Sequence, residues 1–283
     1  MLTRRTFVSS TLGVAATALL AGCGGSKQDS ADTSSDTAAE STVLTVAATP
    51  EPHAKILTEF AAPKLAEQGI ELEVKEFTDY VQPNEVVFNG EIDCNYFQHI
   101  NYLNDYNEQN NEDLVSVAKI HYEPFGIYAG KSNDLTNIAD GAEIAVPNDP
   151  TNEARALLLL QQAGLITLKD PENLAATPND ITDNPHKITF REIEAAATPR
   201  ALEDVDFAAI NGNYAQEAGL HAADALVLEE ASGVAFEQYA NIICTSSDKA
   251  NDERIAALVA VLTTDEFKTY LNDTFGEDVL AAF

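Results

Sequence analysis

Arg155 stands at the start of a leucine-rich segment, in the stretch VPNDPTNEARALLLL (residues 146–160). Asp149 followed by Pro150 is typical of a helix N-cap and its first residue, so a helix should begin there. Asn152 then lies one turn before Arg155 on the same face. A guanidinium binds a carboxylate through two parallel hydrogen bonds, and a helix start adds backbone donors. The stretch predicts either a carboxylate-binding site or a structural ion pair with one of the many acidic residues, and local sequence does not decide between them.

Aromatic side chains follow two expected strands, in NYFQHINYL (residues 95–103) and in FTDYVQPN. The first stretch offers Phe97 and His99, and the second offers Phe77 and Tyr80. Aromatic rings and an imidazole at strand ends could form the wall of a pocket for an apolar side chain. The alternative is ordinary core packing, because successive residues of a strand face opposite sides of the sheet and one side is buried.

Two asparagines surround a glycine in AINGNYA, after a short apolar run. Asn211 directly follows that run and is the stronger candidate for ligand binding, with Asn213 beyond it. A side-chain amide can accept a hydrogen bond from an ammonium group or donate one to a carboxylate. The alternative is that Asn211 caps the helix that follows.

Signatures of enzymes and metal sites are missing from the sequence. It contains no GxSxG, GxxxxGK[ST], GxGxxG or HExxH. The five histidines are scattered without ligand spacing, so we expect no enzyme activity, no cofactor and no metal. The formal net charge of -30 argues against nucleic acid as a partner, because phosphate binding needs clustered Lys and Arg. A hydrophobic content of 45% is enough for a substantial core.

The first residues are typical of a cleaved export signal. Residues 1–22 combine a basic start with a short apolar run, and Arg4-Arg5 resembles a twin-arginine signal. Leu20 to Cys23 resembles a lipobox, which predicts that Cys23 is acylated and becomes the mature N-terminus. Residues 23–42 contain no large apolar side chain and should form a flexible tether.

Cys94 and Cys244 remain after the lipobox cysteine is set aside. Both lie in strand-like segments, EIDCNYF and NIICTSS. A disulfide is possible in an exported protein, and two small buried thiols are the alternative. The sequence alone does not bring them together or separate them.

Segments of period 2 and of helical period alternate from residue 43 onward, an order that predicts parallel strands joined by helices. The pattern restarts near residue 141, so we expect an α/β fold of two lobes, each a mostly parallel sheet covered by helices. Lobe 1 should comprise residues 43–126 and 236–283, and lobe 2 residues 127–235, with the ligand cleft between them. Residues 236–246 are expected to form a strand.

These stretches together resemble the methionine-binding lipoproteins of ABC importers, the NlpA family. The matching segments are FTDYVQPNE, GEIDCNYFQHINYL, EPFGIY, AVPNDPTNEARALLLLQQAGLI and AINGNYA, and the likeness covers about residues 43–283. It implies the two-lobed periplasmic-binding-protein fold, type II-like, with the ligand clamped between lobes. Cys94 and Tyr96 depart from the small residues common in the family, and Phe125 stands where Met or Ile is common.

The resemblance also implies roles for single residues. Arg155 and Asn152 would hold the ligand carboxylate, and Asn211 the amino or carboxylate end. The thioether chain would be surrounded by residues of lobe 1 and by one from the crossover: Phe97, His99, Tyr80, Phe77 and Tyr122. An aromatic wall suits a polarizable thioether.

The expected function is therefore an extracytoplasmic solute-binding lipoprotein. It would capture methionine as a monomer, stay on the membrane through the lipid on Cys23, and deliver the ligand to a permease with its ATPase. Three alternatives remain open: a binder of another amino acid or of a Met-containing dipeptide, an enzyme acting on a small anionic substrate, and an adhesive surface lipoprotein.

Overall fold

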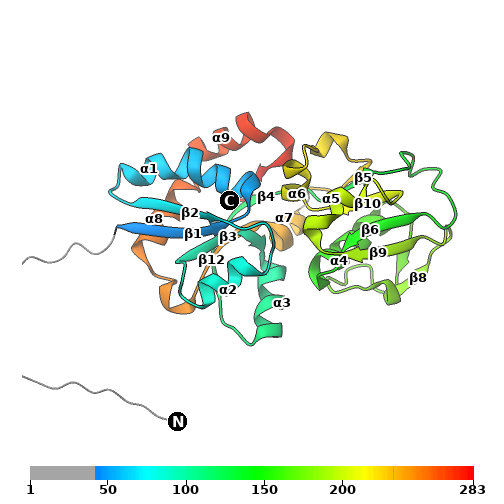
Figure 1. Cartoon of the computed structure of the whole chain (residues 1–283), viewed down its shortest axis with the longest axis horizontal. Helices are drawn as coiled ribbons and strands as arrows, with labels where there is room; N and C mark the ends of the chain where they lie inside the picture. Colours follow the sequence, from blue (N-terminus) through cyan, green and yellow to red (C-terminus); the bar gives the residue numbers. More distant parts are fainter. Residues whose placement is uncertain (1–41, 232) are drawn as a thin grey trace, which may run out of the picture. The chain divides into compact units, whose positions relative to one another are not determined.

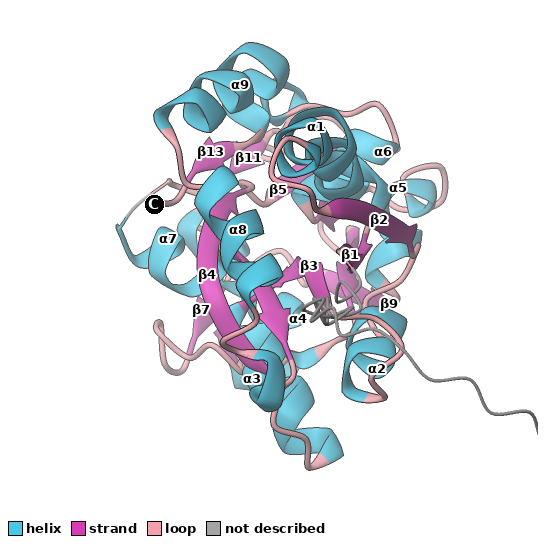
Figure 2. Cartoon of the chain, turned by 90° about the vertical axis from the view of Figure 1, so that its left-hand side faces the viewer, coloured by secondary structure: helices cyan, strands magenta, loops and turns pink. Residues whose placement is uncertain are grey.

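The computed structural model of the protein contains two larger β-sheets, and helices pack against each of them (Figure 1). The structure describes residues 42–231 and 233–283, so the predicted signal peptide, the Cys23 lipidation site and nearly all of the tether lie outside it. In Figure 2 helices surround the strands on several sides. None of the helices in the described residues has the length and apolar character needed to span a membrane.

The first sheet has six strands in the order β13-β4-β12-β3-β1-β2. Its strands are β1 Val43–Ala48, β2 Glu71–Glu76, β3 Cys94–His99, β4 Val115–Tyr122, β12 Asn241–Thr245 and β13 Leu280–Ala281. The helical turns Pro50–Ala54 and Ile56–Ala61 run into α1 Ala62–Ala66. The other helices beside this sheet are α2 Gln82–Phe88, α3 Ile100–Asn110, α8 Glu253–Val261 and α9 Asp265–Phe275. We call this part lobe 1.

The second sheet has five strands in the order β11-β5-β10-β6-β9. They are β5 Gly126–Ala129, β6 Glu143–Pro147, β9 Thr189–Ile193, β10 Phe207–Ile210 and β11 Val227–Leu228. The helices are α4 Pro150–Gln162, α5 Thr198–Ala201 and α6 Gly212–Glu217. A small hairpin of β7 Thr167–Leu168 and β8 Ile181–Asp183 lies between α4 and β9. We call this part lobe 2.

The chain passes between the sheets twice. The first crossover is residues 123–125, between β4 and β5. The second is residues 229–240 and contains α7 Gly233–Tyr239. The crossovers touch, because the backbone N–H of Glu229 donates to the carbonyl of Phe125 at 2.8 Å. The first predicted lobe boundary, between residues 126 and 127, falls after the first residue of β5. The second, between residues 235 and 236, falls within α7.

Two expectations about the elements were wrong. Both sheets are mixed rather than mostly parallel, because β1 pairs in parallel with β2 and β3 whereas β12 pairs antiparallel with β3 and β4. In lobe 2, β6 is parallel to β9 and β10, but β5 is antiparallel to β10 and β11. The start of the predicted strand 236–246 belongs to α7, where Phe236 and Tyr239 follow helical spacing.

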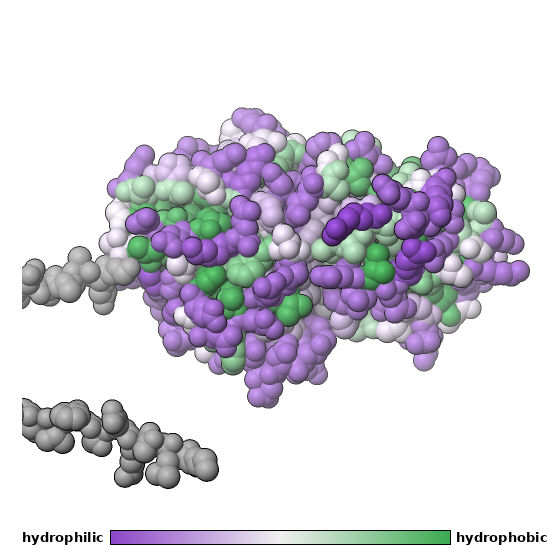
Figure 3. All heavy atoms as spheres, viewed as in Figure 1, coloured by the Kyte–Doolittle hydropathy of each residue, from purple (hydrophilic) through white to green (hydrophobic). Residues whose placement is uncertain are grey.

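Each lobe has its own apolar core. In lobe 1, fully buried Leu44, Val46 and Ile243 pack with Leu258 and Phe267 from the last two helices. In lobe 2, the leucines of α4 pack on the sheet (Leu157, Leu159, Leu160), as their spacing predicts. The face of the molecule in Figure 3 is mainly hydrophilic, with apolar side chains dispersed over it.

Cys94 and Cys244 are both free and buried. The antiparallel register pairs Cys94 with Thr245 and Cys244 with Asn95, so the cysteines are one residue out of step. Neighbouring residues of a strand face opposite sides, and the two thiols belong to different core clusters. The question that the sequence left open is therefore answered in favour of two separate buried thiols.

Candidate ligand-binding site between the lobes

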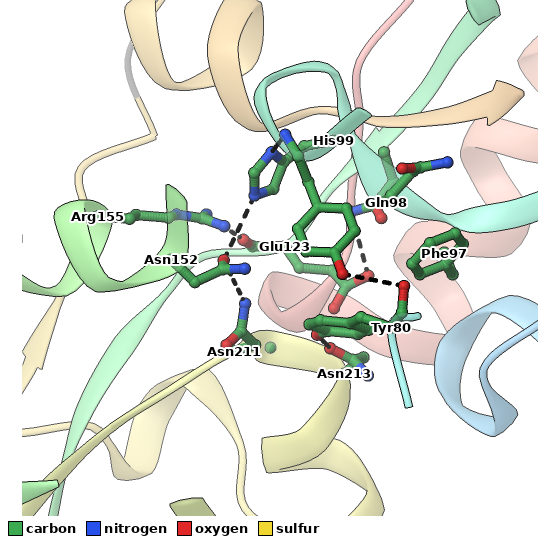
Figure 4. A pocket seen from close by; sticks show the side chains of 12 residues that line it. Tyr80, Phe97, Gln98, His99, Glu123, Asn152, Arg155, Asn211 and Asn213 are labelled. Carbon is green, nitrogen blue, oxygen red and sulfur yellow. Dashed lines mark hydrogen bonds between the residues drawn. The ribbon is translucent and has the colours of Figure 1, made fainter. Parts of the chain in front are cut away.

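A cavity lies where the strand ends of the two lobes meet (Figure 4). Its empty space, part of which is open to solvent, is about 340 Å³. Lobe 1 and the crossovers supply polar and aromatic lining residues, and lobe 2 supplies polar ones: Tyr80, Phe97, Gln98, His99, Tyr102, Glu123, Asn241, Asn152, Arg155, Asn211, Gly212 and Asn213.

The start of α4 forms one wall of the cavity. Asp149 is the N-cap, as predicted, and its carboxylate accepts from the backbone N–H of Asn152 at 2.9 Å. The side-chain nitrogen of Asn152 also donates to Asp149. Its amide oxygen accepts from Asn211 Nδ2 at 2.8 Å and lies 3.3 Å from His99 Nε2. Asn152 thus links the capped helix to a residue on each side of the cleft.

Arg155 lines the cavity and forms an ion pair, so the structural reading of the sequence is confirmed, and its binding of a ligand carboxylate stays a prediction. Its Nε donates to Glu229 Oε1 at 3.0 Å, and its Nη2 donates to Glu229 Oε2 at 2.6 Å. Nη2 also donates to the carbonyl oxygen of Glu123 at 3.0 Å. Burial opposes the charge of Arg155, but Glu229 raises its pKa above the usual value, so the guanidinium is a permanent cation at the cavity wall.

Asn211 and Asn213 carry the polar atoms that the fold leaves unpaired here. Asn211 occupies the N-cap position of α6, but its side chain makes no capping hydrogen bond. Among the described residues, Asn211 Oδ1 and Asn213 Nδ2 are buried without a hydrogen-bond partner. A buried polar group without a partner costs free energy. One acceptor and one donor are therefore available to a ligand.

Lobe 1 supplies an aromatic wall. The ring centroid of Tyr80 lies 5.7 Å from those of Phe97 and Tyr102. His99 caps α3, because its Nδ1 accepts from the backbone N–H of Tyr102 at 3.1 Å. Burial, and secondarily Arg155, lowers the pKa of His99 to about 3, so its ring is neutral. In Figure 4, Phe97 and Tyr80 lie on one side of the site, and Arg155 and Asn152 lie on the other.

Two predicted site residues lie outside the cavity lining. Tyr122 is fully buried, its ring faces Phe236 at 4.8 Å, and its hydroxyl donates to Glu229. Phe77 packs against the apolar cluster beneath α2 and α3. The position of Tyr122 follows from strand geometry, because its neighbour Glu123 faces the cavity instead.

Glu123 is the main lining residue that the sequence reasoning did not select. Its exposed fraction is 5%, and burial raises the pKa of its carboxyl to about 7. Its place directly after a strand and before a proline, in HYEP, is the signal that could have identified it. Gln98 and Asn241 were not selected either, and Tyr102 was considered only as part of its stretch.

One group of side chains in the described residues has the composition of a metal site. Ligand atoms of His53, His121 and Glu123 all lie within 4.8 Å of one another. These atoms are hydrogen-bonded among themselves or to Asn241. The group therefore forms a buried hydrogen-bond network beside the cavity.

Direct contacts cross the cleft. The Tyr80 hydroxyl donates to Asn213 Oδ1 at 2.5 Å, and the Tyr214 hydroxyl donates to the carbonyl of Thr78 at 3.3 Å. Together with the contact between His99 and Asn152, they hold the two lobes against each other around the cavity (Figure 4).

Comparison with known proteins identifies the family. A family model described as NlpA lipoprotein matches residues 44–283. The chain belongs to the NlpA lipoprotein family. It is 39% identical over 219 residues to the D-methionine-binding lipoprotein MetQ of Salmonella typhi, an alignment covering 76% of this chain and 79% of MetQ.

Solved structures agree with this family. A lipoprotein from Ruminococcus gnavus ATCC 29149 is similar with a TM-score of 0.83 and 48% identity, covering 85% of this chain and 99% of that one. A nutrient binding protein from Burkholderia cenocepacia, solved bound to methionine, has a TM-score of 0.79 and 36% identity, covering 85% of this chain and all of the other (100%). The resemblance drawn from the sequence and the two-lobed α/β substrate-binding fold are both confirmed.

Proposed function

We propose that this NlpA-family protein captures methionine between its lobes outside the cytoplasm and delivers it to an ABC importer. The observation that carries the proposal is the composition of the cavity. One permanent cation, one buried carboxylate and an aromatic wall correspond to the carboxylate, the ammonium group and the apolar side chain of such an amino acid.

The carboxylate of the ligand would bind at Arg155. Glu229 takes Nε and Nη2, which leaves Nη1 outside this ion pair. Charge-assisted hydrogen bonds from a buried guanidinium are strong. The amide of Asn213 adds a second unpaired donor. Asn152 would act mainly by orienting Asn211 and His99, since its own donor is taken by Asp149.

The ammonium group of the ligand would bind between Glu123 and Asn211. The Glu123 side chain is bonded to imidazoles and amides rather than to a Lys or Arg side chain. A buried carboxylate is costly without a cation, and an ammonium group would supply one. The unpaired Asn211 Oδ1 can accept a further hydrogen bond from it.

The thioether chain would pack on the aromatic wall of lobe 1. Sulfur makes favourable contacts with aromatic rings about 5 Å away. Tyr80, Phe97 and Tyr102 lie within that distance of a common centre, since their ring centroids are 5.7–6.0 Å apart. Closure of lobe 1 onto a ligand held by lobe 2 would favour the closed state that the transporter recognises.

The membrane steps rest on the N-terminal sequence. Acylation of Cys23 would hold the monomeric protein at the outer face of the cell membrane, within reach of the permease and its ATPase. No catalytic step is part of this function. Replacing Arg4-Arg5 with Lys-Lys should block export if the twin-arginine pathway is used, measured by fractionation. Continued export would refute that pathway.

Calorimetry with purified protein tests the ligand. Both enantiomers of methionine, other free amino acids and Met-containing dipeptides are titrated into it. We expect saturable heat with methionine and weaker binding of amino acids with charged side chains. Arg155→Ala should weaken binding far more than Arg200→Ala, an exposed arginine of α5. Absence of heat with either enantiomer would refute methionine as the ligand.

A further inference from the structure

Glu123 receives an unusual set of donors on one of its carboxylate oxygens. Oε1 lies 2.6 Å from His121 Nε2 and 3.4 Å from Asn241 Nδ2. His53 Nε2 is 3.4 Å from Oε1, but its hydrogen bond is to Asn241 Oδ1 at 3.0 Å. The other oxygen, Oε2, lies against Gly212, where an added Cβ would come within 2.9 Å of it. Gly212 lines the cavity, so its lack of a side chain lets the carboxylate reach the ligand space.

The far sides of both imidazoles are also fixed. Nδ1 of His121 is hydrogen-bonded to the Tyr96 hydroxyl, and Nδ1 of His53 lies 2.8 Å from the Thr49 hydroxyl. An ionised carboxylate can only accept hydrogen bonds. One proton arrangement satisfies these groups: each hydroxyl donates to Nδ1, His121 Nε2–H donates to Glu123 Oε1, and His53 Nε2–H donates to Asn241 Oδ1, whose Nδ2 donates to Glu123 Oε1.

This network is sealed from solvent. The exposed fractions are 1% for His53 and 0% for His121, Tyr96 and Thr49. Neither histidine lines the cavity, so neither can touch a ligand there. Burial lowers the pKa of His53 to about 4 and that of His121 to about 3, so both rings are neutral donors rather than cations.

We propose that His121 directly, and His53 through Asn241, are positioning residues that hold Oε1 of Glu123 and leave Oε2 to receive the ammonium group of the ligand. The inference rests on the proposed function, in that the ligand is an α-amino acid. Two neutral donors stabilise the anionic carboxylate without neutralising it. The network would thereby make the site select an amino acid over the same molecule with a hydroxyl in place of the amino group.

The test compares two ligands on several variants of the full-length chain, purified in detergent. The ligands are methionine and its α-hydroxy analogue, 2-hydroxy-4-(methylthio)butanoate, measured by calorimetry. His121→Phe removes the donor and keeps a ring in the space. Loss of a hydrogen bond to a charged group should weaken methionine binding about tenfold to a hundredfold. Binding of the hydroxy analogue should change less than about twofold, because its hydroxyl makes no ion pair.

A milder variant keeps the test valid if His121→Phe does not fold. Tyr96→Phe removes only the hydroxyl behind His121, and it should weaken methionine binding by a few-fold and the analogue not at all. Tyr106→Phe, a buried tyrosine of the same lobe outside the network, is the matched control. In a Glu123→Gln background, Tyr96→Phe should have no further effect on the preference between the ligands.

Several results would overturn the inference. Equal weakening of both ligands by Tyr96→Phe and His121→Phe would mean that the network is only structural. A stoichiometric Zn²⁺ complex, formed with zinc chloride and lost in His121→Phe, would mean that the imidazoles bind metal instead. If the unchanged chain does not bind methionine at all, the proposed function fails first, and this inference fails with it.

Discussion

The ion pair between Arg155 and Glu229 allows the structural and ligand-binding roles of Arg155 to be separated. Both side chains are nearly buried, with exposed fractions of 5% and 11%, and two hydrogen bonds of 3.0 and 2.6 Å join them. Arg155→Met would leave the carboxylate of Glu229 buried without its cation. Breaking such a pair by removing one partner costs about 3–5 kcal/mol of unfolding free energy.

A second substitution should restore stability without restoring function. Glu229→Gln removes the uncompensated charge and keeps an oxygen that can accept from the Tyr122 hydroxyl. The double variant Arg155→Met with Glu229→Gln should therefore recover to within about 1–2 kcal/mol of the unchanged protein. Its affinity for methionine should stay about tenfold to a hundredfold lower, because the carboxylate of the ligand has lost its charged donor.

Denaturant unfolding and calorimetry on the same samples give both quantities. For a folded region of this size, the loss in the single variant corresponds to a melting temperature lowered by roughly 10 °C. Arg200→Met, an exposed substitution in the same lobe, controls for loss of a positive charge. If the double variant binds methionine as tightly as the unchanged protein, Arg155 serves the ion pair alone. If the single variant is fully stable, the burial argument is wrong.

Two further predictions follow from the cleft. The carboxyl of Glu123, with a pKa raised to about 7, faces His53, His121 and amide donors, and a ligand ammonium requires its ionised form. Below pH 7 the carboxyl of Glu123 must lose its proton before the ligand binds, so methionine should bind about tenfold more weakly at pH 6 than at pH 8. A calorimetric affinity that does not change with pH would contradict this. So would a pH dependence that persists in Glu123→Gln. Tyr80→Phe removes the 2.5 Å hydrogen bond to Asn213 that crosses the cleft. This should cost about 1 kcal/mol of closure, seen as a larger radius of gyration without ligand in X-ray scattering; an unchanged radius and affinity would argue against a closing role.

Most of the fold could be predicted from the sequence, because the hydrophobic residues of its segments recur with a clear strand or helix period. The helix beginning at Asp149 was predictable from its cap, proline and buried leucines, and the structure places it as expected. Strand direction was not predictable, because hydrophobic alternation is the same in parallel and antiparallel strands. β12 reads as an ordinary buried strand, yet it enters lobe 1 from the other lobe and runs antiparallel to both neighbours.

The site was predictable only in part, and for a similar reason. Local sequence identified Arg155, but not its partner Glu229, which lies 74 residues away. Glu123 was overlooked because an acidic residue is unremarkable in a chain with 46 of them. His121, two residues earlier, shares its side of the strand and could be inferred from spacing. No spacing rule links Glu123 to His53, which comes from a distant turn and completes the buried group.

Arg155 is also joined to both crossovers, through the backbone carbonyl of Glu123 in the first and the carboxylate of Glu229 in the second. The crossovers are the segments about which the lobes could rotate, and they are bonded to each other. The guanidinium therefore sits close to the hinge axis, where rotation moves atoms least. Opening would part Tyr80 from Asn213 while leaving the cation and its supports assembled. The carboxylate of an amino acid would thus bind first, while the lobes are open. Its side chain would contact the aromatic wall only when the lobes close.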